Sequence, residues 1–142
     1  WIAPIRDNLS FLFGQGKGRR KSRTKQDSNE NSYLSLLMEE GKIEVEAITY
    51  IRGRSIPNSF IIIDEAQNLS MHELKTIITR VGDGTKIVLT GDIDQIDNTH
   101  VDAYTNGLTC AVEKFKQYAI AGHVTMIKGE RSELATLATK VL

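Results

Sequence analysis

Two adjacent acidic residues, Asp64 and Glu65, directly follow a run of four apolar residues, Phe60 to Ile63. Three of the four are β-branched, and a short unbroken apolar run predicts a strand buried on both faces of a parallel sheet. The two carboxylates would then lie at the carboxyl end of that strand, where open α/β sheets bind their ligands. Acids at such a position need a cation, and the expected one is a Mg²⁺ ion carried by a nucleotide.

This pattern is that of a Walker B motif, although many strands end in an acid only because the next loop is solvated. Polar groups follow two further predicted strands: Thr90–Gln95 follows Lys86–Thr90, and Lys128–Arg131 follows His123–Ile127. In a parallel sheet the carboxyl ends of all strands meet at one edge. The sequence therefore predicts that the three groups converge on one ligand.

The residue types at these strand ends fit phosphoryl transfer to water, which needs a metal ion, a group that orients the water and cations over the γ-phosphate. Asp64 would hold Mg²⁺ through water, and Glu65 would polarise the attacking water. Gln95 would contact both the γ-phosphate and that water. Arg131 would bring a positive charge to the start of a helix, where the backbone also favours anions.

The elements that must position these residues alternate between strand and helix. Strands are predicted at Ile43–Thr49, Phe60–Ile63, Lys86–Thr90 and His123–Ile127. Helices are predicted at Trp1–Phe13, Asn31–Glu40, Ser70–Val81, Leu108–Ala119 and from about Ser132 onwards. For the third helix, Ser70 and Glu73 form a capping box with Leu69 and Leu74 as its hydrophobic staple. Strands that alternate with helices predict an α/β fold with a parallel sheet and right-handed crossovers.

Composition is that of a soluble globular domain, with 142 residues of which 40% are hydrophobic and 25% charged. The sequence shows neither a signal peptide nor an apolar run long enough for a membrane span. A single cysteine, Cys110, excludes an internal disulfide and fits a reducing cytoplasm. The three histidines and this cysteine have no metal-ligand spacing.

Charge is distributed unevenly although the net charge is zero. The segment from Gln15 to Gln26 carries six of the 18 basic residues and no acidic one, which leaves 12 basic against 18 acidic residues elsewhere. We expect a flexible basic loop at residues 14–30, because this stretch is rich in Gly, Lys, Arg and Ser. It is either a solvated linker or a contact for nucleic-acid phosphates.

The ordered set of motifs resembles the PhoH family of P-loop ATPases, which are relatives of the superfamily 1 helicase motor. Phe60–Asn68 followed by Thr90–Asp97 carries most of the resemblance. Further matching segments are Trp1–Asn8, Tyr50–Arg54, Asn106–Leu108 and Lys128–Ala135. The resemblance extends over nearly the whole chain apart from the basic loop.

The resemblance implies a RecA-like P-loop NTPase core, a three-layer αβα fold with a mostly parallel sheet that binds ATP and Mg²⁺. Asp64 and Glu65 would be Walker B, Thr90–Gln95 the sensor loop beneath the γ-phosphate, and Arg131 an arginine near the nucleotide, in cis or from a neighbouring subunit. Further candidate nucleotide contacts are Gln67, Thr90, Gly91, Asp92, Arg52 and Arg54, the last two with ordinary surface charge as the alternative. Family members are linked to RNA metabolism, some carry an N-terminal PIN nuclease domain, and ring-shaped oligomers occur.

One departure from the family pattern is large, because no Gly-x-x-x-x-Gly-Lys-Ser/Thr motif occurs. Gly14–Gly18 is glycine-rich, but its spacing is wrong. We therefore expect an N-terminally truncated, partial PhoH-like ATPase domain with a helical segment at residues 1–41 and an α/β core at 42–142. Such a fragment would be inactive alone, whereas the intact protein would hydrolyse ATP.

Two alternative functions do not require hydrolysis. In a phosphoacceptor receiver domain Asp64 would take the phosphate, but Glu44 and Glu46 lie at the wrong end of their strand to assist it, and Lys128 is the only suitable lysine. A non-catalytic nucleotide- or RNA-binding interaction module would keep the motifs without activity. Nucleotide titration of the full-length protein distinguishes this module from an ATPase.

Overall fold

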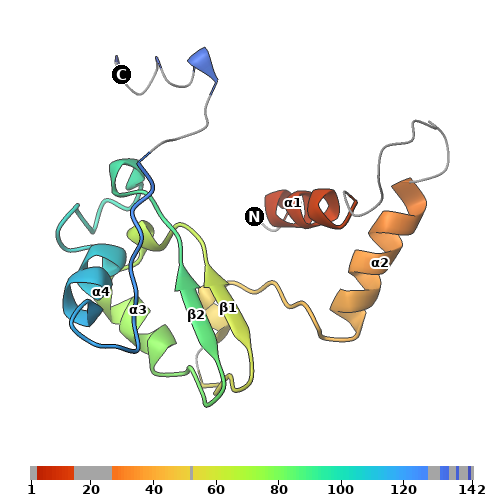
Figure 1. The fold of residues 1–142 in the computed structure, drawn as a ribbon, viewed down its shortest axis with the longest axis horizontal. Coiled ribbons are helices and arrows are strands. Elements are labelled where there is room, and N and C mark those ends of the chain that lie inside the picture. The colour runs from red at the N-terminus through yellow and green to blue at the C-terminus, as the bar shows by residue number, and fades with distance from the viewer. Residues whose placement is uncertain are drawn as a thin grey trace. The chain divides into compact units, whose positions relative to one another are not determined.

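The computed structural model describes residues 3–14, 27–51, 53–127, 132–134, 137 and 141. The chain forms two compact units, Trp1–Ile51 and Arg52–Leu142. Figure 1 shows the course of the chain through its helices and strands. In the part of the chain that is described, no helix is both long enough and apolar enough to cross a membrane.

The first unit is built on two helices that pack against each other, α1 (Ala3–Gly14) and α2 (Asp27–Glu39). Both helices were predicted, but α2 begins at Asp27 rather than at Asn31, so the end of the expected basic loop is helical. The chain leaves α2 through Gly41, whose φ of 66° lies in the left-handed region that ends many helices. The remainder of the expected loop, residues 15–26, lies outside the described residues.

The strand predicted at Ile43–Thr49 is wrong. Residues 44–47 have no regular structure, and a 3₁₀ helix, Ile48–Ile51, follows them. The alternation of apolar and polar residues was present, but a strand also needs a neighbour for its backbone hydrogen bonds. None of the described residues provides a ladder for this segment.

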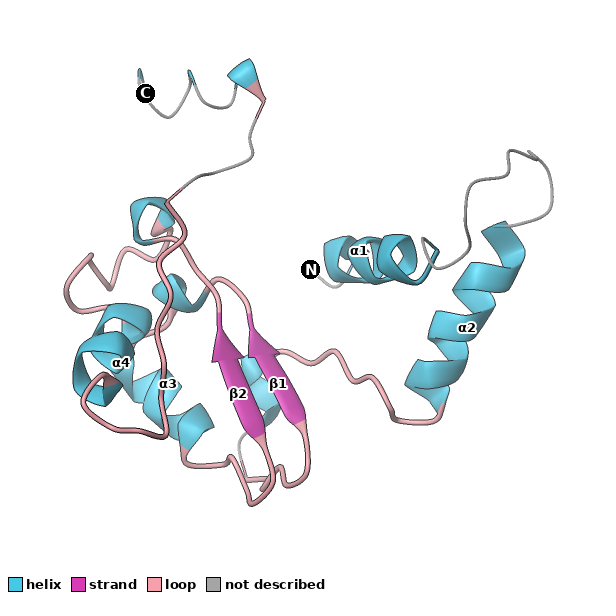
Figure 2. Ribbon diagram, in the orientation of Figure 1, coloured by secondary structure: helices cyan, strands magenta, loops and turns pink. Residues whose placement is uncertain are grey.

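The second unit contains a two-stranded parallel sheet, β1 (Phe60–Ile63) and β2 (Lys86–Leu89). Phe60 pairs with Lys86 and Ile63 with Leu89, so the strands are in register and end together. Figure 2 shows the two arrows pointing the same way, with helix in the connection between them. The expected α/β order with parallel strands is confirmed for this pair.

The connecting helix α3 (Met71–Ile78) begins as its sequence predicted. The Ser70 hydroxyl accepts from the Glu73 backbone N–H at 3.2 Å, and the Glu73 carboxylate accepts from the Ser70 backbone N–H at 2.9 Å, which completes the capping box. Helix α4 (Gly107–Phe115) is capped by Asn106, whose side chain accepts from the Thr109 N–H at 2.9 Å. It packs against α3 and against the turn after β1.

The core of the second unit lies on one side of β1. Its buried apolar residues are Ile63, Ala66, Leu69, Leu74, Ile77 and Ala111. On the other side of β1, Phe60 and Ile62 are 64% and 63% exposed. The expectation of a strand buried on both faces is therefore wrong for the described residues, because helices cover only one face.

The strand predicted at His123–Ile127 is also wrong. These residues have no regular structure, and Val124, Met126 and Ile127 are 82%, 89% and 98% exposed. An extended apolar segment without a pairing strand gains neither ladder hydrogen bonds nor burial. Of the helix expected from Ser132, the described residues Glu133, Leu134, Leu137 and Val141 are helical.

Candidate functional site

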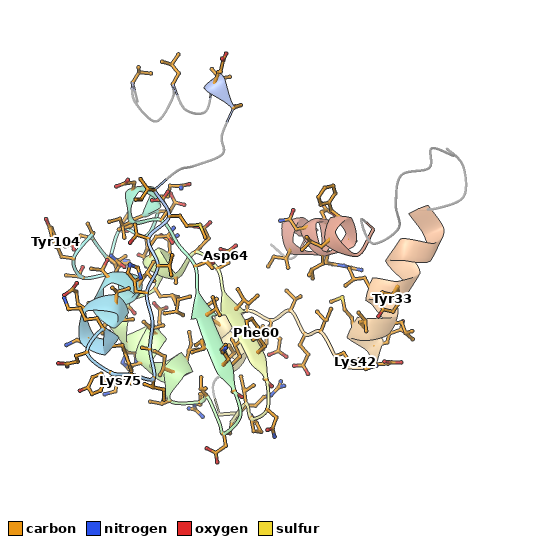
Figure 3. All side chains as sticks on the ribbon, viewed as in Figure 1. Tyr33, Lys42, Phe60, Asp64, Lys75 and Tyr104 are labelled. Carbon is orange, nitrogen blue, oxygen red and sulfur yellow. The ribbon has the colours of Figure 1, made fainter. Side chains whose placement is uncertain are left out.

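The carboxyl ends of β1 and β2 carry two of the three predicted groups, and the backbone binds them together beyond the sheet. The Thr90 N–H donates to the Ile63 carbonyl at 2.9 Å, and the Ala66 N–H donates to the Thr90 carbonyl at 2.9 Å. Figure 3 shows Asp64 at the tip of β1, the end where these bonds form. The loop after each strand is therefore fixed against the other.

Asp64 is held by the loop of the neighbouring strand. Its Oδ1 accepts from the Thr90 hydroxyl at 2.7 Å and from the Glu65 N–H at 3.1 Å. The side chain is exposed, and hydrogen bonds from the described residues reach only this one of its two oxygens. Asp64 therefore presents an oriented carboxylate at the edge of the sheet.

Glu65 adopts a left-handed backbone conformation, with φ 54° and ψ 37°. A non-glycine residue in this region is strained by about 1–2 kcal/mol. The surrounding bonds hold it there: its Oε2 accepts from the Gln67 side chain at 2.6 Å, and its carbonyl accepts from the Asn68 N–H at 3.0 Å. The turn thus sets the direction of an exposed carboxylate at the cost of backbone strain.

Gln67 is fully buried between the two loops and bonds to both of them. Its Nε2 donates to the Glu65 carboxylate and, at 3.1 Å, to the Gln95 carbonyl, while its Oε1 accepts from the Asp92 N–H at 3.2 Å. The Gln95 side chain in turn donates to the Asp92 carboxylate. One connected network therefore joins the predicted catalytic residues Glu65 and Gln95.

Gly91 provides the space for this arrangement. A Cβ at this position would lie 2.3 Å from Gln67 Oε1 and 2.9 Å from a methyl carbon of Leu108. The glycine is needed here for close approach, and the buried amide occupies the place where a side chain would be. Gly91 thus allows the Gln67 side chain to pack against the loop that follows β2. Its contact with the nucleotide stays a prediction.

Asn68 is a residue whose part in the site the sequence analysis missed. Its Oδ1 accepts from the backbone N–H groups of Asp97 and Asn98 at 2.8 and 3.1 Å, and its carbonyl accepts from the Asn98 side chain at 2.8 Å. One feature of the sequence could have indicated this role. Ser70 already caps the following helix, so Asn68 is not needed as an N-cap and its side chain can bond elsewhere. Asn68 fixes the segment that directly follows the Thr90–Gln95 loop.

Of the remaining candidates, the structure describes only Arg54. Ile56 pairs with Val81 before β2 begins, so the segment that carries Arg54 enters at the amino ends of the strands, opposite Asp64. Nucleotide contact by Arg54 stays a prediction. Arg52, Arg131 and the whole of Lys128–Arg131 lie outside the described residues.

The carboxylates of Asp64 and Glu65 suit a Mg²⁺ ion carried by a nucleotide better than a metal ion held entirely by protein ligands. No group of three or more His, Cys, Asp or Glu residues that could hold a metal occurs within the described segments. Mg²⁺ is commonly held by one or two carboxylates together with phosphate oxygens and waters. Asp64, exposed and with one oxygen engaged by Thr90, fits that requirement.

Comparisons with known proteins agree with the motifs. The family model described as PhoH-like protein matches residues 1–141. Protein PhoH2 of Bacillus subtilis (strain 168) is 52% identical over 142 residues, which is 100% of this chain and 29% of that protein. Protein PhoH2 of Mycolicibacterium smegmatis is 41% identical over 109 residues, 77% of this chain and 25% of that protein.

This chain therefore spans less than a third of the length of these relatives. The matching segment nevertheless includes nearly every residue of the chain, from the first helix through the joined loops after β1 and β2. The chain belongs to the PhoH family.

Proposed function

We propose that the intact protein binds ATP with Mg²⁺ at the carboxyl ends of β1 and β2 and hydrolyses it there. The observation that carries the proposal is the single hydrogen-bonded network that joins the carboxylate of Glu65 to Gln95 across two strand ends. Family membership supports a nucleotide hydrolase of the P-loop type. A complete three-layer RecA-like core, in which further elements of the protein cover Phe60 and Ile62, is part of the proposal.

In this proposal Asp64 holds the Mg²⁺ through water, and the metal neutralises charge on the phosphates. The Gln67 hydrogen bond to Oε2 of Glu65 leaves Oε1 to accept a proton from the attacking water. Gln95 has an exposed side chain, so rotation of that side chain alone exchanges its bond to Asp92 for one to the γ-phosphate. Arg131 contributes positive charge near the nucleotide.

The test is Mg²⁺-dependent ATP hydrolysis by the intact protein and its Glu65→Gln variant. A lost general base lowers kcat by about 10²- to 10⁴-fold, while ATP affinity remains near that of the wild type because Asp64 is unchanged. Asp83→Asn is the matched control, since Asp83 is an exposed acid at the amino ends of the strands. Equal rates for wild type and Glu65→Gln would remove the proposed role of Glu65.

Coupling to RNA is a separate part of the proposal and rests on the six basic residues between Gln15 and Gln26. Neutralising phosphates with these residues would make RNA binding depend steeply on salt. Deletion of Gly16–Lys25 is expected to weaken RNA binding and to flatten that dependence. Unchanged RNA affinity and salt slope would contradict the assignment.

A further inference from the structure

All three hydrogen bonds of the buried Gln67 side chain are directed at the candidate site. A primary amide offers two N–H donors and one carbonyl oxygen. In Gln67 the nitrogen bonds to Glu65 Oε2 at 2.6 Å and to the Gln95 carbonyl at 3.1 Å, and the oxygen accepts from the Asp92 N–H at 3.2 Å. With an exposed fraction of 0%, the side chain is out of the reach of solvent.

The partners also fix which way this amide points. A carboxylate and a carbonyl can only accept, and a backbone N–H can only donate. Turning the amide over would place its oxygen against two acceptors and its N–H groups against the Asp92 N–H. The observed orientation is therefore the one in which all three bonds form.

Gln67 connects two residues that would have to meet the same water. It bonds directly to the carboxylate of Glu65 and to the backbone at both ends of the Asp92–Gln95 turn. Asp92 in turn accepts from the Gln95 side chain. Moving Gln67 therefore changes the separation between the Glu65 carboxylate and the Gln95 amide.

We propose that Gln67 is a positioning residue that sets the Glu65 carboxylate at a fixed separation from Gln95, so that both groups orient the same water. The proposal rests on the proposed hydrolysis of ATP at this site. Gln67 acts through other residues, so its loss lowers kcat and leaves the KM for ATP nearly unchanged.

The experiment measures ATP hydrolysis by the intact protein with Gln67→Met, which keeps the volume and removes the bonds. Gln67→Glu is made in parallel, because it keeps an oxygen for the Asp92 N–H and removes both donors. We expect kcat to fall about 10- to 100-fold in each variant, since a misplacement of about 1 Å can have this effect. Thr85→Val is the control, because the Thr85 hydroxyl bonds to Ser59 and Ile56 at the amino ends of the strands, away from the candidate site.

A double-mutant cycle with Glu65→Gln separates positioning from general stability. If Gln67 works through Glu65, then Gln67→Met changes the residual single-turnover rate of Glu65→Gln by less than about twofold. If the rate losses of the two single variants multiply in the double variant, or if Thr85→Val loses as much kcat as Gln67→Met, the positioning role is overturned while the proposed ATPase stands. A wild-type protein that does not hydrolyse ATP would overturn the proposed function itself, and the positioning role with it.

Discussion

Both ends of strand β1 carry a non-glycine residue in the left-handed region, Asn58 with φ 50° before the strand and Glu65 with φ 54° after it. At the amino end the contacts connect side chains with backbone. The Thr85 hydroxyl donates to the Ile56 carbonyl at 2.7 Å and accepts from the Ser59 N–H at 3.0 Å. These bonds pair backbone groups of Ile56 and Ser59 with a side chain, and they hold the segment before β1 against the segment before β2.

At the carboxyl end, side chains bond to other side chains. Thr90 bonds to Asp64, Gln67 bonds to Glu65, and Gln95 bonds to Asp92. Asparagine tolerates the left-handed region well, whereas glutamate gains nothing from it. In the proposed function, the strain at Glu65 serves to direct its carboxylate.

Substitution of one glycine at each end of the sheet gives the largest expected difference in kcat between the two ends. Gly91→Ala would push Gln67 Oε1 from its place, since the new Cβ lies 2.3 Å from it. We expect kcat to fall about 10- to 100-fold. Gly84→Ala is the partner: its φ is 71° and its Cβ would lie 2.5 Å from Asn58 Oδ1, so it costs about 1–2 kcal/mol of stability with unchanged kcat. ATPase rates and denaturant unfolding measure the two effects, and equal kcat losses would break the comparison.

Two threonines provide the next test. Thr90→Val removes the hydroxyl that orients Asp64, and we expect the Mg²⁺ concentration for half-maximal activity to rise about tenfold. Thr85→Val instead removes the acceptor of the Ser59 N–H and one of the two hydrogen bonds to the Ile56 carbonyl, which costs about 1–3 kcal/mol of stability. Metal titrations of both variants measure the contrast. A Thr90→Val protein with the wild-type Mg²⁺ requirement would show that Asp64 needs no such support.

Substitution by glycine is expected to change stability differently at the two left-handed residues, Glu65 and Asn58. Glu65→Gly should be more stable than Glu65→Ala by about 1 kcal/mol, because glycine removes the backbone strain. Asn58→Gly should match the wild type within about 0.5 kcal/mol, since Asn already tolerates this conformation. Denaturant unfolding of the intact protein measures both. An Ala variant at position 65 as stable as the Gly variant would mean that the turn relaxes.

A small pH effect is expected away from both ends. Hydrogen bonds from the Tyr104 and then the Thr105 backbone hold the pKa of Asp102 below its ordinary value of 3.8. A carboxylate whose pKa is lowered by folding adds stability above its unfolded pKa and loses it as the pH falls through the folded pKa. Wild type should therefore lose slightly more stability than Asp102→Asn on acidification through this range. Superimposable pH–stability curves would contradict this.

The sequence predicted local elements well wherever the signal was local. The capping box at Ser70 and the parallel pairing of Phe60–Ile63 depend on residues close in sequence or on strong apolar runs. The strand predictions for Ile43–Thr49 and His123–Ile127 were wrong, because a strand depends on a neighbouring strand that its own sequence does not specify.

The site was predictable to the level of strand ends and no further. The acids after Ile63 and the polar loop after Leu89 indicated one edge of a sheet. That Gln67 is buried and bonded to both loops depends on the backbone turn at Glu65 and on the space left by Gly91. Neither feature is encoded in a residue type alone.

The most direct measurement of the central claim is the location of the bound metal–nucleotide. Mn²⁺ with a non-hydrolysable ATP analogue is added to the intact protein with labelled isoleucine methyl groups, and paramagnetic broadening is recorded. We predict strong broadening of Ile63 and Ile93, which lie beside Asp64 and Asp92, and a sharp signal for Ile56 at the amino ends of the strands. Broadening of Ile56 with Ile93 unaffected would contradict the account.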